Sequence, residues 1–457
     1  MLVQRGAIAT VTPNARFWRV LLLIVLGALA LRVGYVLVAK HDEPRLGDQI
    51  YYNVAADQLA RGHGFTDPRD GSQTAQHPPL TAIALAPTSW VSERFDPGGG
   101  HVLAQRLTMA VFGAGVVLLI ALVARTVAGN RAALLAAIIA ALYPNLWMND
   151  GLIMAETLAT AAVALTVLLA YRFGRSPTWA NAAWLGAAVG LAMLARAELG
   201  LLLPFMVLPV ALFARALTVG RRLLLFVASC AAALVVVSPW LVANLTRFDE
   251  PVLFSTNDGL TICGANNHGS WYGSGTGLWA NQGCGAYLKP LRELGLEAST
   301  LSNSLRDQGL DYIGNHLGRL PVVVAARVAR VWSLYAPGYM ADYNRGEGRE
   351  VWASWLGFAT FWLLVPFTVA GAVVLRRRRV PLTPLLAQFA LVTFTAAVIY
   401  GLVRFRVPAE VSIVVLSAVA VDRLLRPGDR AAGAVDCAAE TAGGGLAPTP
   451  TGASSRD

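Results

Sequence analysis

Charged side chains are scarce in this chain. Asp, Glu, Lys and Arg together make up 14% of its 457 residues, whereas soluble domains usually contain about a quarter of charged residues. Hydrophobic residues make up 56%, and they occur in repeated runs of about the length that crosses a bilayer, roughly 20 residues. The scarcity of charge therefore excludes an ordinary water-soluble globular protein.

Cysteine is equally rare. The four cysteines are too few for a disulfide-rich scaffold, and they lack the Cys-x-x-Cys spacing that is typical of a metal site. Cys230 lies in an apolar run and Cys437 in a C-terminal tail. Cys263 and Cys284 fall in one polar loop, where they can form a disulfide if that loop faces an oxidising compartment. The sequence alone leaves this pairing open.

Lysine and the common nucleotide motifs are also nearly absent. Only Lys40 and Lys289 are lysines, so arginine supplies almost all of the positive charge in a chain with a formal net charge of +10. No Walker loop, HExxH, GxSxG or dinucleotide fingerprint occurs, which weighs against ATP-driven transport and soluble-cofactor chemistry. A basic excess can indicate nucleic-acid binding, so the positions of the arginines decide its meaning.

Ten apolar runs are present, and we interpret each as a membrane span. The first is too long for the core of a signal peptide and lacks a small-residue cleavage site, so we expect a retained helix. The ten runs are Phe17–Ala39, Ala104–Val123, Ala132–Trp147, Ala155–Arg172, Trp179–Leu194, Leu199–Leu217, Leu223–Ala243, Ala353–Leu375, Leu382–Val403 and Val407–Val421.

Arginines gather before the first run and after every even-numbered one. Cytoplasmic loops retain Lys and Arg, so we expect both termini on the cytoplasmic side of a bacterial inner (plasma) membrane. Most of the basic excess then reports topology, and no nucleic-acid partner is expected. The arginines concerned are Arg5, Arg16, Arg19, Arg125, Arg131, Arg172, Arg175, Arg215, Arg221, Arg222, Arg376 to Arg379, Arg423, Arg426 and Arg430.

This topology leaves two large outward-facing loops, at about Lys40–Leu103 and Asn244–Trp352. Each contains one apolar segment that is short or charged, Pro79–Val91 and Leu320–Leu334. We expect both segments to be juxtamembrane helices lying along the outer membrane surface.

The fold class that follows is an all-α polytopic membrane protein with about ten transmembrane helices. Residues 1–426 are expected to form one transmembrane domain. Residues 427–457 are rich in Ala, Gly, Pro, Thr and Ser and have few large apolar side chains, which predicts a disordered cytoplasmic tail.

Acidic residues stand where the predicted spans meet the outer surface. Asp48 follows the first span by about nine residues, with Tyr51, Tyr52 and His77 in the same loop. A carboxylate just outside the membrane can accept a proton from an acceptor hydroxyl. The alternative is an ordinary loop acid or a helix N-cap.

Two further acids, Asp150 and Glu156, lie in the short connection between the third and fourth spans. Glu156 begins a span, where a carboxylate also complements the helix dipole. The functional interpretation is a second acidic group that faces Asp48 across a cavity and positions an acceptor or binds a divalent ion.

Three arginines lie on the predicted outer side, against the general charge pattern. Arg196 lies between the fifth and sixth spans, and Arg404 and Arg406 lie between the ninth and tenth. A guanidinium group matches phosphate oxygens bidentately, so these residues are candidates to hold an anionic group at the bilayer interface. The alternative is an ion pair with Glu198 or Glu410, or contact with lipid headgroups.

The second outer loop begins SPWLVANLTRFDEPVLFSTNDGLTICGANNHGSWYG. Its Asn, Gly and Trp content suits a turn-rich surface that contacts a sugar by hydrogen bonds and ring stacking. The same composition is also ordinary for an exposed loop.

Taken in order, several segments resemble the glycosyltransferase C superfamily, specifically the bacterial family 39 type related to protein O-mannosyltransferases and the aminoarabinose transferase of lipid A. The segments are GDQIYYNVAADQLARGHGF with HPPL, then LIMAETLA, LARAELGLLLP, SPWLVANLTRF with STNDGLTICGANN, and YGLVRFRVPAE.

The resemblance implies an inverting transfer of a hexosyl or pentosyl group from a polyprenyl-phosphate donor to a glycan, lipid or protein acceptor on the outer face. Asp48 matches the general base of that family, and Glu156 resembles an acid of the second outer loop. Arg404, Arg196 and Arg406 look like the contacts to the donor phosphate. No cofactor is certain, and a divalent cation, Mg²⁺ or Mn²⁺, is the candidate.

Two other functions fit the composition. A lipid or sugar transporter or flippase also has many spans, but it would be expected to place ionisable residues near the membrane midplane, where this sequence has few. A non-catalytic scaffold of an envelope-assembly complex would use the large outer loops as docking surfaces.

Overall fold

The chain folds almost entirely into helices in the computed structural model, which describes residues 15–98, 100–214, 216–281, 283–284 and 295–426. Across these ranges no β-strand is present, and the single isolated bridge joins Thr66 to Gln73. The predicted all-α class is therefore confirmed. The predicted tail at 427–457 lies outside the described residues.

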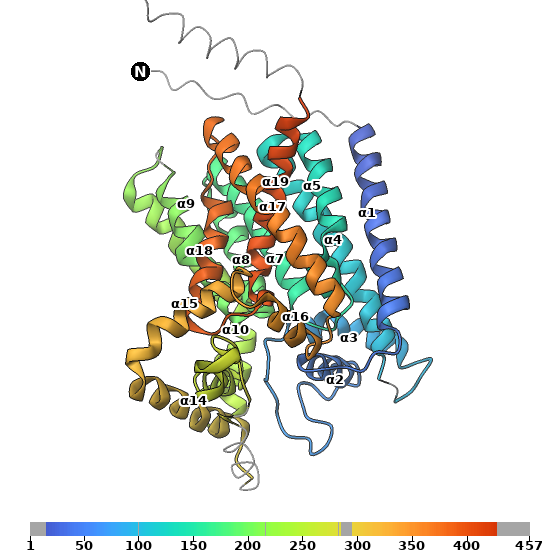
Figure 1. Cartoon of the computed structure of the whole chain (residues 1–457), viewed down its shortest axis with the longest axis vertical. Coiled ribbons are helices and arrows are strands. Elements are labelled where there is room, and N and C mark those ends of the chain that lie inside the picture. The colour runs from blue at the N-terminus through green and yellow to red at the C-terminus, as the bar shows by residue number, and fades with distance from the viewer. Residues whose placement is uncertain (1–14, 99, 215, 282, 285–294, 427–457) are drawn as a thin grey trace, which may run out of the picture.

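Long apolar helices form an upright bundle (Figure 1). Five are long and apolar enough to cross a membrane, counting α1 with the π-helical turn that continues it. They are α1 (Ala15–Tyr35, continued to Lys40), α4 (Val102–Ala128), α7 (Glu156–Arg175), α10 (Val219–Arg247) and α17 (Val351–Arg377). A sixth candidate is the pair α5 (Asn130–Leu142) and α6 (Pro144–Asp150), which is bent by 58°.

The predicted count of ten spans is not confirmed. Three of the other apolar runs are helical but short or interrupted: α8 (Trp179–Ala195), the broken stretch Ala197–Leu212 that ends in α9 (Leu208–Leu212), and α18 (Thr383–Val398). The last run forms α19 (Val407–Leu424), which has 18 residues and carries Glu410, Asp422 and Arg423. At 1.5 Å per residue, a 17-residue helix such as α8 is about 25 Å long, less than the roughly 30 Å hydrocarbon core. A hydropathy run alone does not reveal such breaks.

Glycines bring two helix pairs into close contact. A Cβ atom at Gly186 of α8 would lie 2.0 Å from the Ser229 carbonyl oxygen of α10, and one at Gly371 of α17 would lie 1.9 Å from the Leu416 carbonyl oxygen of α19. No side chain larger than hydrogen fits at either position. These contacts let backbones approach closely, as small residues do in membrane helix pairs.

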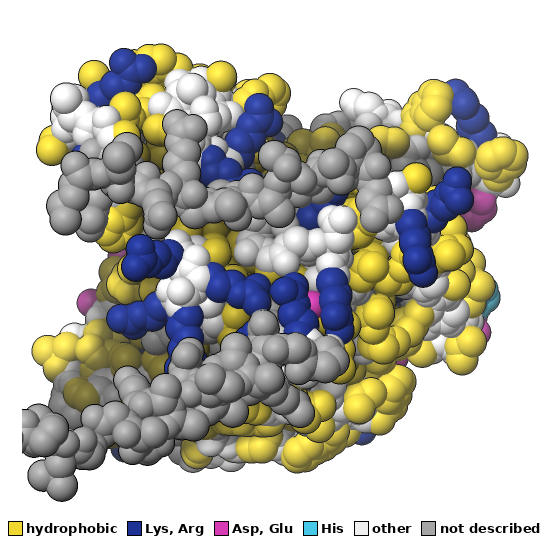
Figure 2. All heavy atoms as spheres, turned by 90° about the horizontal axis from the view of Figure 1, so that it is seen from above, with side chains coloured by type: hydrophobic (Ala, Val, Ile, Leu, Met, Phe, Trp, Pro, Cys, Tyr) yellow, Lys and Arg dark blue, Asp and Glu magenta, His cyan; other side chains and the backbone are white. Residues whose placement is uncertain are grey.

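The basic end of the bundle is the end where the described chain begins and finishes (Figure 1). Figure 2 shows Lys and Arg side chains gathered over this face. Arg131 at the start of α5 pairs with Asp422 near the end of α19 at 3.3 Å, and Arg175 at the end of α7 donates to the Thr126 carbonyl oxygen near the end of α4. The arginine pattern thus marks one end of the bundle, as expected.

The opposite end carries a lobe of shorter helices (Figure 1). Both segments predicted as juxtamembrane helices are helical, as α3 (Leu80–Ser92) and α15 (Leu320–Val331). The helices of this lobe are α2 (Asp48–Ala60), α3 (Leu80–Ser92), α11 (Asp258–Ala265), α12 (His268–Trp271), α14 (Ala298–Asn315), α15 (Leu320–Val331) and α16 (Pro337–Arg345).

Candidate active site

A cavity of about 890 Å³ lies between the lobe and the bundle. Segments that are far apart in the sequence line it: α2, the loop between α2 and α3, α11, α16 and the connection between α18 and α19. Asp48, His77 and Arg404 are all on its wall. The first outer loop, the second outer loop and the last outer connection therefore meet at one place.

Asp48 is the first residue of α2, and it follows Gly47, whose φ of +56° favours glycine. One carboxylate oxygen lies 3.4 Å from His77 Nε2, and the other lies 2.9 Å from an Arg404 terminal nitrogen. The side chain keeps 28% of its surface exposed, so it remains open to the cavity. Its position matches neither a plain loop acid nor a simple N-cap.

Burial raises the pKa of Asp48, but the nearby His77 and Arg404 outweigh burial and hold this pKa well below the ordinary value. Asp48 is consequently ionised at neutral pH. A carboxylate with so low a pKa is a weak base, and it stays weak for as long as Arg404 remains beside it.

The predicted first-loop residues surround Asp48. His77 stacks on Tyr52 with ring centres 5.1 Å apart and meets Tyr51 edge-on at 5.2 Å. The Tyr51 hydroxyl donates to the His77 backbone carbonyl oxygen at 3.5 Å. These contacts fix the imidazole against α2, so that its Nε2 atom faces the carboxylate.

Arg404 lies in a short 3-10 turn (Val403–Arg406) and is surrounded by carboxylates. Besides Asp48, its guanidinium lies 3.0 Å from Glu347 Oε1 and 3.8 Å from Glu156 Oε1. The Tyr400 hydroxyl is 3.5 Å away. Its side chain is 13% exposed, which leaves one cation at the cavity wall with three anionic partners.

Glu156 lies beneath this contact, with 1% of its side chain exposed. Its Oε1 atom is 3.1 Å from Arg196 and 3.7 Å from Arg349, and Arg196 also pairs with Glu198 at 2.6 Å. The structure therefore joins Glu156 to Asp48 through Arg404. The two acids do not face each other across open space.

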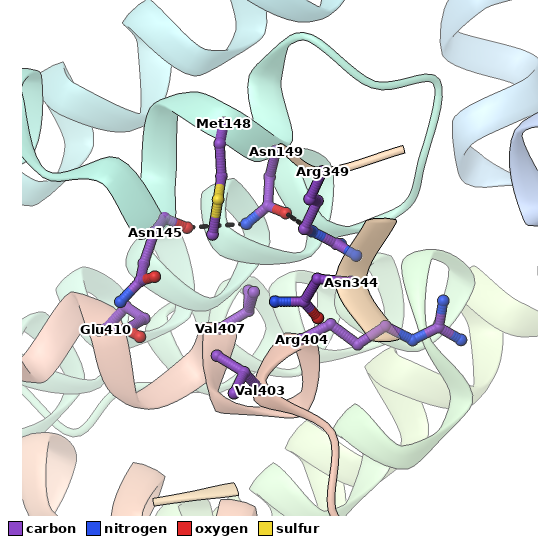
Figure 3. A pocket seen from close by; sticks show the side chains of 9 residues that line it. All are labelled: Asn145, Met148, Asn149, Asn344, Arg349, Val403, Arg404, Val407 and Glu410. Carbon is purple, nitrogen blue, oxygen red and sulfur yellow. Dashed lines mark hydrogen bonds between the residues drawn. The ribbon is translucent and has the colours of Figure 1, made fainter. Parts of the chain in front are cut away.

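Sequence reasoning missed Glu347 and Arg349, which lie between α16 and α17. Arg349 contacts Glu347 and donates to Asn149 at 2.9 Å (Figure 3). The signal that could have found them is the dense charge of the segment GEGRE directly before a long apolar run. The segment lies near the end of the second large loop, at about Asn244–Trp352.

The charged groups of the site nearly balance. Three guanidinium groups meet four carboxylates, and His77 adds one further titratable group at Asp48. The residues are Arg196, Arg349 and Arg404 on one side and Asp48, Glu156, Glu198 and Glu347 on the other. Any anion that approaches Arg404 must therefore compete with these carboxylates.

A divalent cation has no ready place in this arrangement. Within the described ranges, no group of three or more His, Cys, Asp and Glu side chains is placed to hold a metal ion. The site carboxylates are already paired with guanidinium groups, so a divalent cation would have to displace a guanidinium group to reach their oxygens. The cation stays a prediction, and the proposed reaction is routed through the side chains alone.

Two predicted site residues, Asp150 and Arg406, form ion pairs outside the cluster of Asp48, Arg404 and Glu156. Arg406 is fully buried, pairs with Glu410 at 2.6 Å and donates to the Ser333 hydroxyl at 2.9 Å. Asp150 is buried against Arg32 of α1 at 2.7 Å and accepts from the Thr157 hydroxyl at 2.7 Å. Both geometries are those of buried structural ion pairs.

The burial of the Arg32–Asp150 pair leads to a prediction about stability. Asp150→Asn keeps the side-chain shape but leaves the buried Arg32 cation without an anion, which costs about 3–5 kcal/mol in comparable cases. We expect a markedly lower melting temperature of the purified protein in detergent, with normal turnover per folded molecule. Asp42→Asn is the control, because the Asp42 side chain is 95% exposed. A stable but inactive Asp150→Asn protein would instead assign Asp150 to the site.

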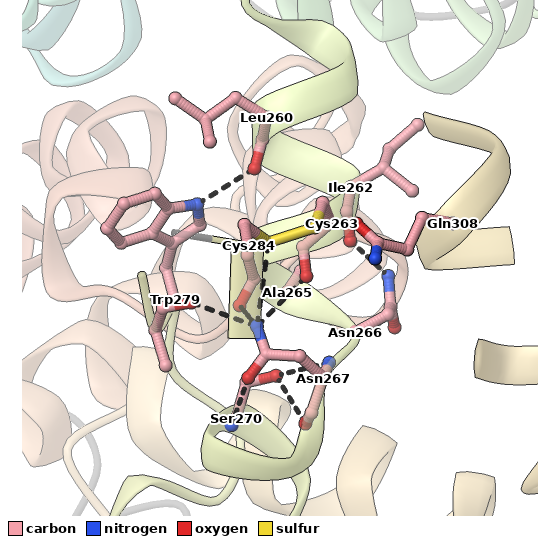
Figure 4. Close-up of a disulfide and its surroundings, with 12 residues drawn as sticks. Leu260, Ile262, Cys263, Ala265, Asn266, Asn267, Ser270, Trp279, Cys284 and Gln308 are labelled. Atoms are coloured by element: carbon pink, nitrogen blue, oxygen red, sulfur yellow. Dashed lines mark hydrogen bonds between the residues drawn. A yellow bond between two sulfur atoms is a disulfide. The ribbon is translucent and has the colours of Figure 1, made fainter. Parts of the chain in front are cut away.

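The two cysteines of the second outer loop form a disulfide, Cys263–Cys284 (Figure 4). It joins α11 to a loop that also carries Trp279, and the Asn267 side chain donates to the carbonyl oxygens of Cys263, Gly264 and Ala280. The pairing that the sequence left open is present, and it holds this part of the lobe together.

Comparisons with known proteins show which family and which folds this chain resembles. Residues 77–242 match the model of a family described as Dolichyl-phosphate-mannose-protein mannosyltransferase. No curated protein matches the chain by sequence.

Solved structures show the same fold. Archaeal oligosaccharyltransferase AglB from Archaeoglobus fulgidus, in complex with an inhibitory peptide and a dolichol-phosphate, matches with a TM-score of 0.56 and 17% identity, over 95% of this chain and 53% of that one. An apo oligosaccharyltransferase of the same organism matches with a TM-score of 0.53 and 17% identity, over 90% and 50% of the two chains. The chain thus spans about half the length of these proteins.

A more distant match is ArnT from Cupriavidus metallidurans bound to undecaprenyl phosphate, with a TM-score of 0.42 and 15% identity, over 90% of this chain and 77% of ArnT. The family match and the fold shared with the archaeal enzymes confirm the predicted resemblance of this chain to the glycosyltransferase C superfamily.

Proposed function

We propose that this membrane protein transfers a sugar from a polyprenyl-phosphate donor to an acceptor on the extracytoplasmic face of a bacterial inner membrane. The observation that carries the proposal is the contact between Asp48 and Arg404 at the wall of the 890 Å³ cavity. This contact supports the proposal because a carboxylate that can take a proton and a guanidinium group that can bind phosphate lie side by side, at the end of the bundle opposite the basic face.

In the proposed reaction, an acceptor hydroxyl attacks the anomeric carbon while Asp48 takes its proton. The bond between that carbon and the phosphate oxygen breaks, and the lipid phosphate leaves with the bonding electrons. Arg404, whose side chain is 13% exposed, stabilises the negative charge that develops on the phosphate. One displacement inverts the anomeric configuration.

The other charged residues have positioning roles in this proposal. Glu156, Arg196 and Arg349 form a buried layer behind Arg404 and fix its direction. His77 holds the Asp48 carboxylate from the other side. The disulfide of the second outer loop suits an oxidising, extracytoplasmic compartment.

The test is a transfer assay on membranes that contain the protein. A panel of labelled undecaprenyl-phosphate sugars is supplied, and the glycosylated product is identified by mass spectrometry. We expect one or a few of these donors to give a product only when the wild-type protein is present.

Two outcomes contradict the proposal. Absence of transfer from every donor of the panel contradicts it directly. Movement of labelled lipid across vesicle membranes without transfer supports a flippase instead.

A further inference from the structure

Trp279 lies on the wall of the same cavity, in the disulfide-closed loop after α11. It is half-buried, and no motif of the sequence had singled it out. Its indole N–H donates to the Leu260 carbonyl oxygen at 3.2 Å (Figure 4). An indole has one donor and no acceptor, so this bond uses all of its hydrogen-bonding capacity. What remains for the cavity is an aromatic surface.

The position of the indole is set by its neighbours. A Cβ atom on Gly264 would lie 1.9 Å from the Trp279 ring nitrogen, so only glycine lets the ring lie against α11. The Ala280 amide donates to the Gly264 carbonyl oxygen at 2.9 Å, and the residue directly before Gly264, Cys263, forms the disulfide. An aromatic ring held this firmly loses little entropy when a ligand packs on it.

Trp279 is also connected to the charged centre. The Tyr343 hydroxyl of α16 donates to the Trp279 carbonyl oxygen at 3.1 Å. Tyr343 lines the cavity, as does Glu347, which contacts Arg404. The aromatic surface and the phosphate-binding cation are thus two parts of one wall.

Polar side chains line the same cavity as Trp279. They include Asn257, Thr261, Gln76 and Asp342. A cavity that offers an aromatic face together with amide, hydroxyl and carboxylate groups suits a ligand with both C–H faces and hydroxyl groups.

We infer that Trp279 is a specificity-determining residue on which a pyranose ring stacks during transfer. The inference rests on the proposed function and deepens it, because it names the part of the wall that recognises sugar. The ring belongs either to the donor or to a glycan acceptor, and both present the same C–H face to an indole.

The experiment compares two lipids on the purified full chain. Undecaprenyl-phosphate mannose and undecaprenyl phosphate differ only in the sugar, and glucose replaces mannose if the transfer assay selects it. In Trp279→Ala we expect binding of the sugar-bearing lipid to weaken about fivefold to tenfold, as for the loss of one aromatic contact. Binding of undecaprenyl phosphate is expected to stay within twofold of wild type. If the acceptor supplies the ring, both lipids bind normally and the acceptor KM rises instead.

A second variant moves the ring without removing it. Gly264→Ala is expected to reproduce the effect of Trp279→Ala, because the new methyl group displaces the indole. Gly314→Ala is the matched control, since a Cβ atom there meets nothing within 4 Å. Trp279→Phe keeps an aromatic ring and is expected to retain most of the binding of the sugar-bearing lipid. If Gly264→Ala does not fold, the comparison of Trp279→Phe with Trp279→Ala replaces it.

The inference is overturned if Trp279→Ala leaves both binding constants and both KM values within twofold of wild type. Equal weakening for the two lipids also overturns it, since a structural role alone would give that result. Both outcomes leave wild-type transfer intact, whereas failure of the proposed function removes wild-type transfer itself.

Discussion

Asp48→Asn is expected to lower the rate of sugar transfer by about two to four orders of magnitude, the usual effect of removing a general base. Asparagine has nearly the same size and can still face Arg404, but it cannot take a proton from the acceptor hydroxyl. The measurement is transfer in membranes at saturating donor, normalised to the amount of folded protein.

The control for this variant is Asp70→Asn. Asp70 lies in the same outer loop and is exposed, and it does not line the cavity. We expect it to transfer at the wild-type rate. Near-normal transfer by Asp48→Asn would show that Asp48 is not the base. If Asp48→Asn does not accumulate in membranes, the same measurement is made on Asp48→Glu, which keeps the carboxylate but moves it.

Arg404→Ala is expected to reduce kcat/KM for the lipid donor by about 100-fold to 1000-fold, the range seen when one donor to a developing oxyanion is removed. The KM for the acceptor should change much less. Arg404→Lys keeps the charge but loses the planar fork of donors, so an intermediate value is expected. If donor affinity stayed unchanged and only acceptor affinity fell, Arg404 would not contact the phosphate.

The same variant should move the acid limb of the pH profile. Arg404 and His77 lower the pKa of Asp48 against the effect of burial. Without Arg404, one of the two groups that lower the pKa of Asp48 is lost. The effect of burial then weighs more, and the pKa of Asp48 rises. Protonation of the base then begins at a higher pH, and the fall in activity on acidification shifts upward relative to wild type. The comparison is made on kcat/KM from pH 4 to pH 8.

Sequence reasoning located those site residues that are charged and lie next to apolar, membrane-spanning segments. Asp48, Glu156, Arg196 and Arg404 are charged residues beside apolar runs, and the structure brings all four into one cluster. Topology inferred from arginine was sufficient for this, because it placed their loops at the same end of the bundle.

The other site residues could not be predicted, because the directions of their side chains depend on tertiary packing and not on their spacing in the sequence. Asp150 is as acidic and as well placed in sequence as Glu156, but α6 turns it towards Arg32. Arg406 is two residues from Arg404, and the short 3-10 turn directs it towards Glu410. Glu347 and Trp279 come from a long loop without periodicity, so only the folded lobe shows that they reach the cavity.

The contact between Arg404 and Asp48 has a consequence for the order of events. In the proposed function, the Arg404 guanidinium group lowers the pKa of the base, Asp48, and also binds the donor phosphate. When the donor phosphate binds Arg404, it partly neutralises the positive charge beside Asp48, and the proton affinity of Asp48 rises. An acceptor that is already bound then meets a stronger base. Transfer of the acceptor proton to Asp48 therefore follows binding of the lipid-linked sugar, whichever substrate enters the cavity first.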